Sequence, residues 1–369
     1  MRQEVGGGWR FVLAAGLAAA GLCVPAGAGT FGDWQYRMKI TFSGYNKSET
    51  LTNFPALVTL STNISTFAYS GFASPATGAD LRFAASNETD ELNYEIEKWD
   101  TNGASYVWVQ VPRLAAASDF IYAYWGKPGA TAPAYTTNGA TWGNGYVGVW
   151  HMREASGAQL KDSTTNANHS SANPFSSTPN GRVGNGMTAS ANYAVVPDSP
   201  SLDWTRITFE GWFKLPNVAV DYGLINKGLN GQIEFGGRVY YDGNYGVWVD
   251  NDGTWPVVAA ASAGAQAGVW QHVAGVYDGA NIHIYVNGVR TTGTAWSGTP
   301  LNAGGALYFG TYYDTTRKYT GDLDEIRISN LARSSNWIWA CWANMSSTDT
   351  FLTFTDLTSR HRGTMIKCH

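Results

Sequence analysis

Charged side chains are scarce in this sequence, and neither sign dominates. Only 14% of the 369 residues are Asp, Glu, Lys or Arg, and the formal net charge is -4. Without a basic patch the chain cannot release counterions from a nucleic acid, so we expect no nucleic-acid partner. The hydrophobic (44%) and aromatic (14%) fractions exclude a disordered or fibrous protein and allow two folded domains.

Cysteine is also rare. Besides Cys23 in the N-terminal apolar segment, the chain holds only Cys341 and Cys368. In an oxidising compartment these two either form a disulfide or are one buried residue and one tail residue. The sequence has no C-x-x-C motif and no Cys/His cluster, which excludes the usual cysteine sites for zinc and for redox chemistry.

Long apolar runs are missing beyond the first segment. Arg2 and Arg10 precede the apolar run 11–24, and Ala26-Gly27-Ala28 follows it as an A-x-A cleavage site. The run is too short for a transmembrane helix, which needs ~20 residues. We therefore predict a signal peptide at 1–28 and a mature chain without a transmembrane segment, which is secreted, periplasmic or on the cell surface.

Strand and turn patterns fill most of the remaining chain. Short alternating apolar runs, separated by Gly, Asn, Ser and Pro clusters, are typical of all-β proteins. We predict two β-sandwich domains, at 30–130 and 146–345, with a linker at 131–145 and a C-terminal tail at 346–369, of which residues 358–369 are unpatterned and frayed. The many short strands of the second domain favour a jelly roll.

Two local signals add detail to the second domain. Asn287-Gly288 directly follows an apolar run and predicts a hairpin turn. The segment 334–344 is the one helical pattern, and Ser334 is its expected N-cap.

One acidic residue of the last predicted strand is unusual. In the segment 321–329, the two-residue period of a strand places Asp324 on the face of Ile326 and Ile328, which we expect to be the core. A carboxylate among isoleucines costs several kcal/mol unless it is hydrogen-bonded or holds a cation. Calcium and backbone N–H donors are the two alternatives.

Three separated motifs of the second domain resemble laminin-G-like jelly rolls of the concanavalin A-like lectin and glucanase superfamily. They are Tyr146-Val147-Gly148-Val149-Trp150-His151-Met152, Trp270-Gln271-His272-Val273-Ala274-Gly275-Val276-Tyr277 and Gly321-Asp322-Leu323-Asp324-Glu325-Ile326-Arg327-Ile328-Ser329. The resemblance implies a concanavalin A-like jelly roll, a fold that hosts lectins, enzymes and adhesion modules. Residues 33–129 resemble an uncharacterised family of bacterial secreted domains, for example in Tyr94-Glu95-Ile96-Glu97-Lys98.

The resemblance also implies one structural calcium ion. Such domains hold it with an Asp-Ser-x-x-Asn loop after the first strand and with oxygens near the last strand. The corresponding loop begins at Asp162, so Asp162 and Asp324 are the predicted metal ligands. Calcium takes six to eight oxygen ligands, and backbone carbonyls can supply the rest. The alternative is that Asp162 caps its own turn and that Asp324 accepts hydrogen bonds from backbone N–H groups.

Aromatic residues and carboxylates cluster around 248–255. Flat aromatic faces pack on sugar rings while carboxylates bind the hydroxyl groups, so these residue types suit a glycan. The predicted carbohydrate-binding residues are Trp255, Tyr241, Asp250, Asp252 and Tyr313, and Tyr312 and Arg317 accompany the last of these. The alternative is an ordinary hairpin, in which 250–253 form the turn and Trp248 is buried.

The candidate catalytic residues are Glu95, Glu97 and Asp100. Their i, i+2, i+5 spacing resembles the acidic triplet of some retaining glucanases, in which a bulged strand directs all three into a cleft. The third residue is Asp rather than Glu, and the triplet lies outside the jelly roll, so we expect no catalytic role. Other catalytic motifs are missing from the sequence.

The expected function is therefore that of a secreted, non-enzymatic bacterial protein of the cell surface. Its calcium-stabilised lectin-like domain would bind a polysaccharide, a surface glycan or, in adhesion, a cell-surface protein. An extracellular polysaccharide hydrolase and a structural envelope component are the alternatives.

Overall fold

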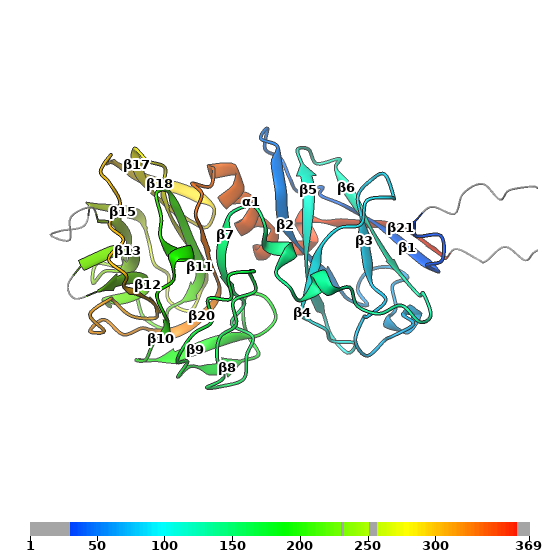
Figure 1. Cartoon of the computed structure of the whole chain (residues 1–369), viewed down its shortest axis with the longest axis horizontal. Coiled ribbons are helices and arrows are strands. Elements are labelled where there is room, and N and C mark those ends of the chain that lie inside the picture. The colour runs from blue at the N-terminus through cyan, green and yellow to red at the C-terminus, as the bar shows by residue number, and fades with distance from the viewer. Residues whose placement is uncertain (1–29, 230–231, 251–256, 360–369) are drawn as a thin grey trace, which may run out of the picture.

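Two β-sandwiches lie side by side, with one helix between them (Figure 1). The computed structural model describes residues 30–229, 232–250 and 257–359. The predicted signal peptide therefore lies outside the described residues. The predicted all-β fold is confirmed. Among the described residues, neither α-helix has the length and apolar character of a membrane span.

The N-terminal sandwich consists of a four-stranded and a three-stranded sheet. The first sheet has the order β21 (Thr353–Ser359), β1 (Tyr36–Thr41), β6 (Phe120–Trp125) and β3 (Arg82–Ala84). The second has the order β2 (Leu51–Leu60), β5 (Ser105–Leu114) and β4 (Tyr94–Lys98), and η1 (Tyr69–Gly71) packs beside them.

The second sandwich is the expected jelly roll. Its eight-stranded sheet contains β18 (Val289–Ala295), β17 (Asn281–Val286), β16 (Trp270–Tyr277), β11 (Ile207–Lys214), β20 (Thr320–Ser329), β9 (Gly186–Ser190) and β8 (Ser176–Thr178), and β7 (Tyr146–Trp150) also pairs with β20. Its six-stranded sheet contains β10 (Ala194–Val196), β19 (Ala306–Phe309), β12 (Tyr222–Leu229), β13 (Gln232–Val239), β14 (Asn244–Val249) and β15 (Val257–Gly264). The short η4 (Pro200–Leu202) precedes β11. Asn287 and Gly288 have φ angles of 50° and 74° and form the predicted turn between β17 and β18.

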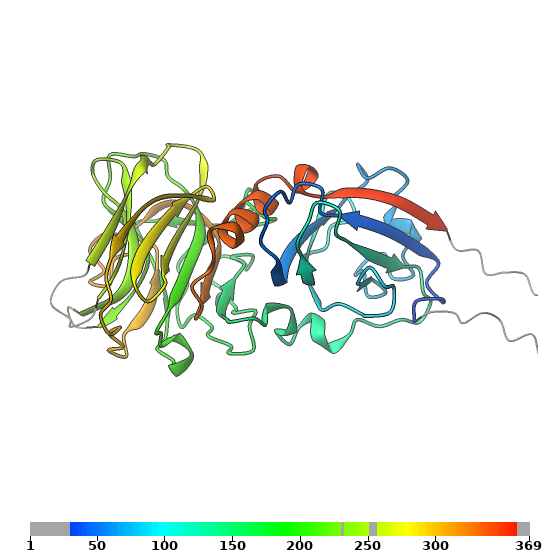
Figure 2. The same ribbon diagram turned by 90° about the horizontal axis from the view of Figure 1, so that it is seen from above.

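The C-terminal segment returns to the N-terminal sandwich. In the predicted C-terminal tail at 346–369, the chain forms α2 (Thr348–Phe351) and then β21, which pairs antiparallel with β1 (Figures 1 and 2) and includes residues 358 and 359 of the segment expected to be frayed. Phe351 and Leu352 are buried in the core of that sandwich. Every side chain of β21 is at least partly exposed, so its sequence carries little apolar alternation. Residues 360–369 lie outside the described residues.

The helix α1 (Ser335–Ser346) fills the space between the sandwiches (Figure 2). Ser334 is its N-cap, as predicted, and its hydroxyl accepts a hydrogen bond from the backbone N–H of Trp337 at 3.1 Å. Trp337, Ile338 and Cys341 are buried and belong to one apolar cluster with the N-terminal core. Cys341 is thus a buried thiol, and its pairing with Cys368 stays a prediction because Cys368 lies outside the described residues.

The segment between the sandwiches is more ordered than a linker. Residues 131–145 contain two turns of 3-10 helix, η2 (Ala134–Thr136) and η3 (Ala140–Trp142). Trp142 is buried against Trp108 of β5 and Tyr146 of β7. This segment therefore contributes side chains to the contact between the two sandwiches.

The expected orientation of Asp324 is wrong because β20 contains a bulge. Glu325 has a φ of 49°, and the pairing of β11 with β20 shifts register at this point. Asp324 consequently lies opposite Trp212, whose ring packs on the side of the N-terminal domain, whereas Ile326 and Ile328 face the jelly-roll core. Asp324 is buried at the contact between the sandwiches and not among the isoleucines.

The side chain of Asn344 attaches α1 to the edge of β2. Its Oδ1 accepts a hydrogen bond from the N–H of Leu57 at 2.6 Å, and its Nδ2 donates to the carbonyl of Leu57 at 3.0 Å. The amide group thus pairs one buried residue of the edge strand β2 as a neighbouring strand would.

We predict that Asn344→Ala lowers the free energy of unfolding by about 2–4 kcal/mol, because two buried backbone groups lose their partners. Denaturant unfolding of the full chain measures this. Asn102→Ala, in an exposed turn, is the matched control and should change the stability by less than about 0.5 kcal/mol. Equal losses in the two variants would contradict the role of Asn344.

Candidate functional site

Glu95 and Glu97 lie on β4, on the side that faces the jelly roll. The pairing of β4 with β5 shifts register between Ile96 and Lys98, so Glu97 sits at a bulge. Both side chains are buried at the contact between the sandwiches. Asp100 lies apart from them in the following turn, where its Oδ1 accepts a hydrogen bond from the N–H of Asn102.

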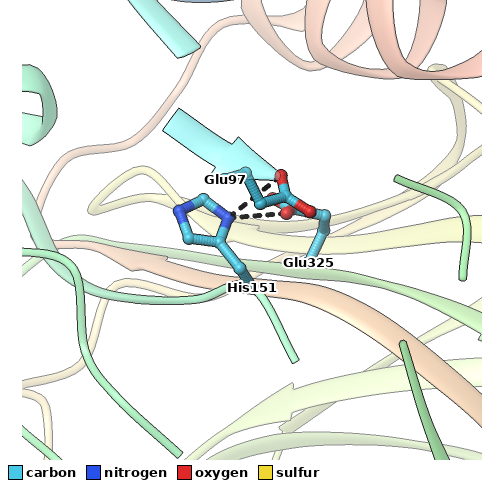
Figure 3. A group of neighbouring side chains, drawn as sticks. All are labelled: Glu97, His151 and Glu325. Atoms are coloured by element: carbon cyan, nitrogen blue, oxygen red, sulfur yellow. Dashed lines mark hydrogen bonds and ion pairs between the residues drawn. The ribbon is translucent and has the colours of Figure 1, made fainter. Parts of the chain in front are cut away.

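His151, which directly follows β7, brings these carboxylates together with the bulge of β20. Its Nδ1 is 2.6 Å from Oε1 of Glu325 and 3.6 Å from Oε2 of Glu97 (Figure 3). Its Nε2 is 3.7 Å from Oε2 of Glu95. We call these four side chains the interdomain cluster. Sequence analysis missed it, because three separate segments of both domains must meet to form it.

Each carboxylate of the interdomain cluster also has a partner outside it. Oε2 of Glu325 accepts a hydrogen bond from Arg327 at 2.5 Å. Oε2 of Glu97 accepts one from the indole of Trp108, and Oε2 of Glu95 one from Trp142, both at 2.7 Å. A second set of donors, Arg153 and Ser163, reaches Oε1 of Glu95. The surroundings therefore hold the three carboxylates in fixed positions.

Burial and charge act in opposite directions on these groups. Desolvation and the neighbouring Glu325 raise the pKa of Glu97 well above its ordinary value. Desolvation opposes the charge of Glu325, but His151 and Arg327 outweigh it and lower the pKa of Glu325 to about 2. Glu325 and Glu95 likewise outweigh desolvation and raise the pKa of His151 to about 10. The imidazole is thus cationic at neutral pH, while burial and the neighbouring carboxylate favour the neutral form of Glu97.

A polar hollow of about 250 Å³ opens beside the interdomain cluster. Glu95 of β4 and Arg153 form one wall, and the loop 161–164 with His169 forms the other. Thr136 and Thr137, near the end of η2, complete the lining. The hollow reaches Glu95, whereas the side chain of Glu97 has no exposed surface.

The predicted calcium ligands accept hydrogen bonds from the protein. Oδ1 of Asp162 accepts from the N–H groups of Val149 and Thr164, and Oδ2 accepts from the hydroxyl of Thr164 and the N–H of Asn168. A carboxylate has about four acceptor positions, so this set uses all of them. Asp324 accepts from the N–H groups of Val183 and Glu325, both at 2.8 Å. These donors fit the hydrogen-bonding alternative, and calcium itself stays a prediction.

Aromatic and arginine side chains gather on the outer face of the six-stranded sheet, and we call this group the aromatic face. Trp248 of β14 lies 5.4 Å from the ring of Tyr312, which lies 4.7 Å from the ring of Tyr313. The guanidinium of Arg238 on β13 lies 4.1 Å from the ring of Tyr240 and 5.6 Å from that of Tyr312.

Acidic and cationic groups accompany these rings. Arg317 lies 4.7 Å from the ring of Tyr312, and Asp221 ion-pairs with Arg317 at 2.9 Å and with Arg238 at 3.5 Å. The indole N–H of Trp248 is buried, and no described residue accepts a hydrogen bond from it. The aromatic face therefore offers flat rings, two cations and a carboxylate within one patch.

The predicted carbohydrate residues have different positions. Tyr313 belongs to the aromatic face, and Tyr241 is 75% exposed in the neighbouring turn between β13 and β14. Asp250 is buried. Asp252 and Trp255 lie outside the described residues. Sequence analysis missed Arg238, although its place on the polar side of β13, between core-facing Gly237 and Val239, was the available signal.

Comparison with known families agrees with the two domains. Residues 188–339 match the concanavalin A-like lectin/glucanases superfamily. Residues 77–152 match a domain of unknown function, DUF2341. The chain thus carries a concanavalin A-like jelly roll preceded by this second domain, as the resemblance predicted. No curated protein sequence matches the chain.

Solved structures resemble about half of the chain. The binding domain of Paraclostridial Mosquitocidal Protein 1 has 15% identity and a TM-score of 0.45, with coverage of 54% of this chain and 52% of that one. The binding domain of botulinum neurotoxin serotype G has 12% identity and a TM-score of 0.45, with coverage of 56% and 52%. Domain 4 of AbnA, an extracellular arabinanase from Geobacillus stearothermophilus solved with arabinotriose, has 15% identity and a TM-score of 0.45, with coverage of 55% and 98%. The chain thus spans about half the length of the two toxin domains.

We predict that Asp162→Ala lowers the free energy of unfolding by about 3–5 kcal/mol, because several buried donors lose their acceptor. Denaturant unfolding in calcium and in chelator measures this, and we expect the same loss in both. Calcium at 100 times its dissociation constant would add about 2.7 kcal/mol to a protein that binds it only when folded. Such a gain in the wild type, absent from Asp162→Asn, would instead support Asp162 as a calcium ligand.

Proposed function

We propose that the protein binds carbohydrate through the aromatic face of its jelly roll. It would act as a non-enzymatic protein outside the cell or on its surface, attached to a polysaccharide or a surface glycan. The observation that carries this proposal is the gathering of the partly exposed rings of Tyr240, Tyr312 and Tyr313, next to the buried Trp248, around Arg238, Arg317 and Asp221.

The chemistry of the aromatic face suits a sugar. Tyr312 and Tyr313 are only partly buried, so their rings can receive the C–H surface of a pyranose or furanose. Arg317 and Asp221 lie beside Tyr312 and can hydrogen-bond to hydroxyl groups. The match of this domain to a superfamily named for lectins and glucanases agrees with such a ligand.

The position of the aromatic face also supports the proposal. The outer face of the eight-stranded sheet is covered by α1 and the N-terminal sandwich, which bury Trp212 and Tyr285 there. The six-stranded sheet lies on the far side of the jelly roll (Figure 1). A long polymer can therefore reach the aromatic face without meeting the N-terminal domain.

A hydrolase centred on Glu95 and Glu97 has less support. A glycosidase needs two carboxyl groups on either side of the scissile bond. The side chain of Glu97 has no exposed surface, and Trp108 covers its Oε2. A polysaccharide would reach it only if the two sandwiches separated.

The test is a binding screen of the full chain against immobilised polysaccharides, followed by titration of the best ligand. We predict that Tyr313→Ala weakens binding about tenfold, which corresponds to ~1.4 kcal/mol, because a stacking ring is lost. Tyr122→Ala on β6 of the other sandwich is the control and should bind like the wild type.

Two outcomes would contradict the proposal. One is a screen in which no polysaccharide binds although the protein is folded by circular dichroism. The other is a ligand whose affinity is equal in wild type and Tyr313→Ala. Release of new reducing ends from a bound polysaccharide, lost in Glu97→Gln, would favour the hydrolase.

A further inference from the structure

The interdomain cluster has the composition of a metal site. Among the described residues, Glu97, His151 and Glu325 can each offer one ligand atom, and these atoms all lie within 4.8 Å of one another. All three side chains are buried. Figure 3 shows both carboxylates pointing toward the same side of the imidazole, where Nδ1 lies.

One buried oxygen of this group has no hydrogen-bond partner among the described residues. Oε2 of Glu97 accepts from Trp108, but Oε1 has no hydrogen-bond partner among the described residues and no exposed surface. A Cβ atom at Gly184 would lie 3.2 Å from this oxygen, so the missing side chain leaves space beside it. A buried carboxylate oxygen without a donor costs free energy, which a bound cation would offset.

The spacing of the atoms suits one small cation. Ligands that each lie ~2.1 Å from a zinc ion are ~3 to 4 Å from each other. Nδ1 of His151 is 2.6 Å from Oε1 of Glu325 and 3.6 Å from Oε2 of Glu97. Small side-chain rotations would therefore place the three residues around one ion.

The far atoms of two candidate ligands face charged groups. Nε2 of His151 is 3.7 Å from Oε2 of Glu95, an ion-pair distance that is too long for a hydrogen bond. A carboxylate on this side of the ring is the kind of group that orients a ligating imidazole. Oε2 of Glu325 is held by Arg327, which leaves Oε1 facing His151. Nδ1 of His151 and Oε1 of Glu325 thus face each other at the centre of the group, and Oε2 of Glu97 lies 3.6 Å from the same nitrogen.

We propose that Glu97, His151 and Glu325 bind one divalent transition-metal ion of the zinc type, which joins the N-terminal domain to the jelly roll. One imidazole and two carboxylates suit zinc better than calcium, which prefers oxygen ligands alone. The ion would replace the proton between His151 and Glu325, and this proton would be released to solvent.

The experiment measures the zinc content of the full chain by mass spectrometry after stripping with a chelator, reloading with zinc chloride and dialysis. We expect about one bound zinc ion per chain, and we expect its binding to require Glu97. Glu97→Gln keeps the shape of the side chain and can still accept the hydrogen bond from Trp108. It should lower the affinity for this zinc ion at least tenfold. Zinc that other histidines or cysteines of the chain bind is still present in this variant, so the zinc content of the variant is subtracted from that of the wild type.

Glu210→Gln is the matched control. Glu210 is also a buried carboxylate beside an imidazole, with Oε2 at 3.2 Å from Nε2 of His272, but among the described residues it belongs to no group of three possible metal ligands. This variant should bind zinc like the wild type. At 100 times its dissociation constant, zinc should raise the melting temperature of the wild type and of Glu210→Gln by about 5 °C, and that of Glu97→Gln by less.

A second variant covers the case in which Glu97→Gln does not fold. Gly184→Ala removes no charge and adds a Cβ beside the free oxygen, so it should also weaken zinc binding at least tenfold. Cobalt(II) supplies an independent readout, because its visible absorption reports nitrogen and oxygen ligation in the wild type. The proposal is overturned if the zinc content, cobalt spectrum and melting shift are the same in wild type and in a folded Glu97→Gln or Gly184→Ala. The interdomain cluster would then be a network of ion pairs and hydrogen bonds without a metal ion.

Discussion

The contact between the two sandwiches depends on charged side chains that are buried together. Glu95 and Glu97 from β4 meet His151, Glu325 and Arg327 of the jelly roll, and all five residues are buried. None of them can be buried alone, because an unpaired charge in such a place costs several kcal/mol. Each therefore requires the other domain in one position, which fixes the orientation of the sandwiches more strictly than apolar packing alone would.

The path of the chain reinforces this constraint. After the last jelly-roll strand, α1 enters the space between the sandwiches, and β21 then completes the first sheet beside β1 (Figure 2). Between them, Asn344 hydrogen-bonds to Leu57 of β2, and Phe351 packs in the core of the N-terminal sandwich. The N-terminal sandwich is thus built from both ends of the described chain, and one apolar cluster runs through it and α1. Unfolding of either sandwich removes partners from the other, so we expect them to unfold together.

Local patterns predicted the fold well where neighbours along the chain decide it. The alternation of Ile207, Phe209 and Phe213, the turn at Asn287 and the cap at Ser334 all depend on nearby residues. The predicted orientation of Asp324 is wrong because a bulge changes the face of the sheet on which the following residues lie. No residue nearby in the sequence indicates that bulge. Likewise, the sequence suggested Glu95 and Glu97 as a pair, but their partners lie on strands far away along the chain. Polar residues buried by another domain look like solvent-facing residues in a sequence pattern.

The same burial determines which surface is left for a ligand. A jelly roll has two broad outer faces, and here the N-terminal domain occupies the one that carries Glu210, Trp212 and His272. The other face presents Tyr312 and Arg317 on the segment that leads from β19 to β20. Because β20 also supplies Glu325, one strand connects the interdomain cluster to the segment that carries the rings. The position of this strand in the contact between the domains therefore helps to hold the aromatic face in place.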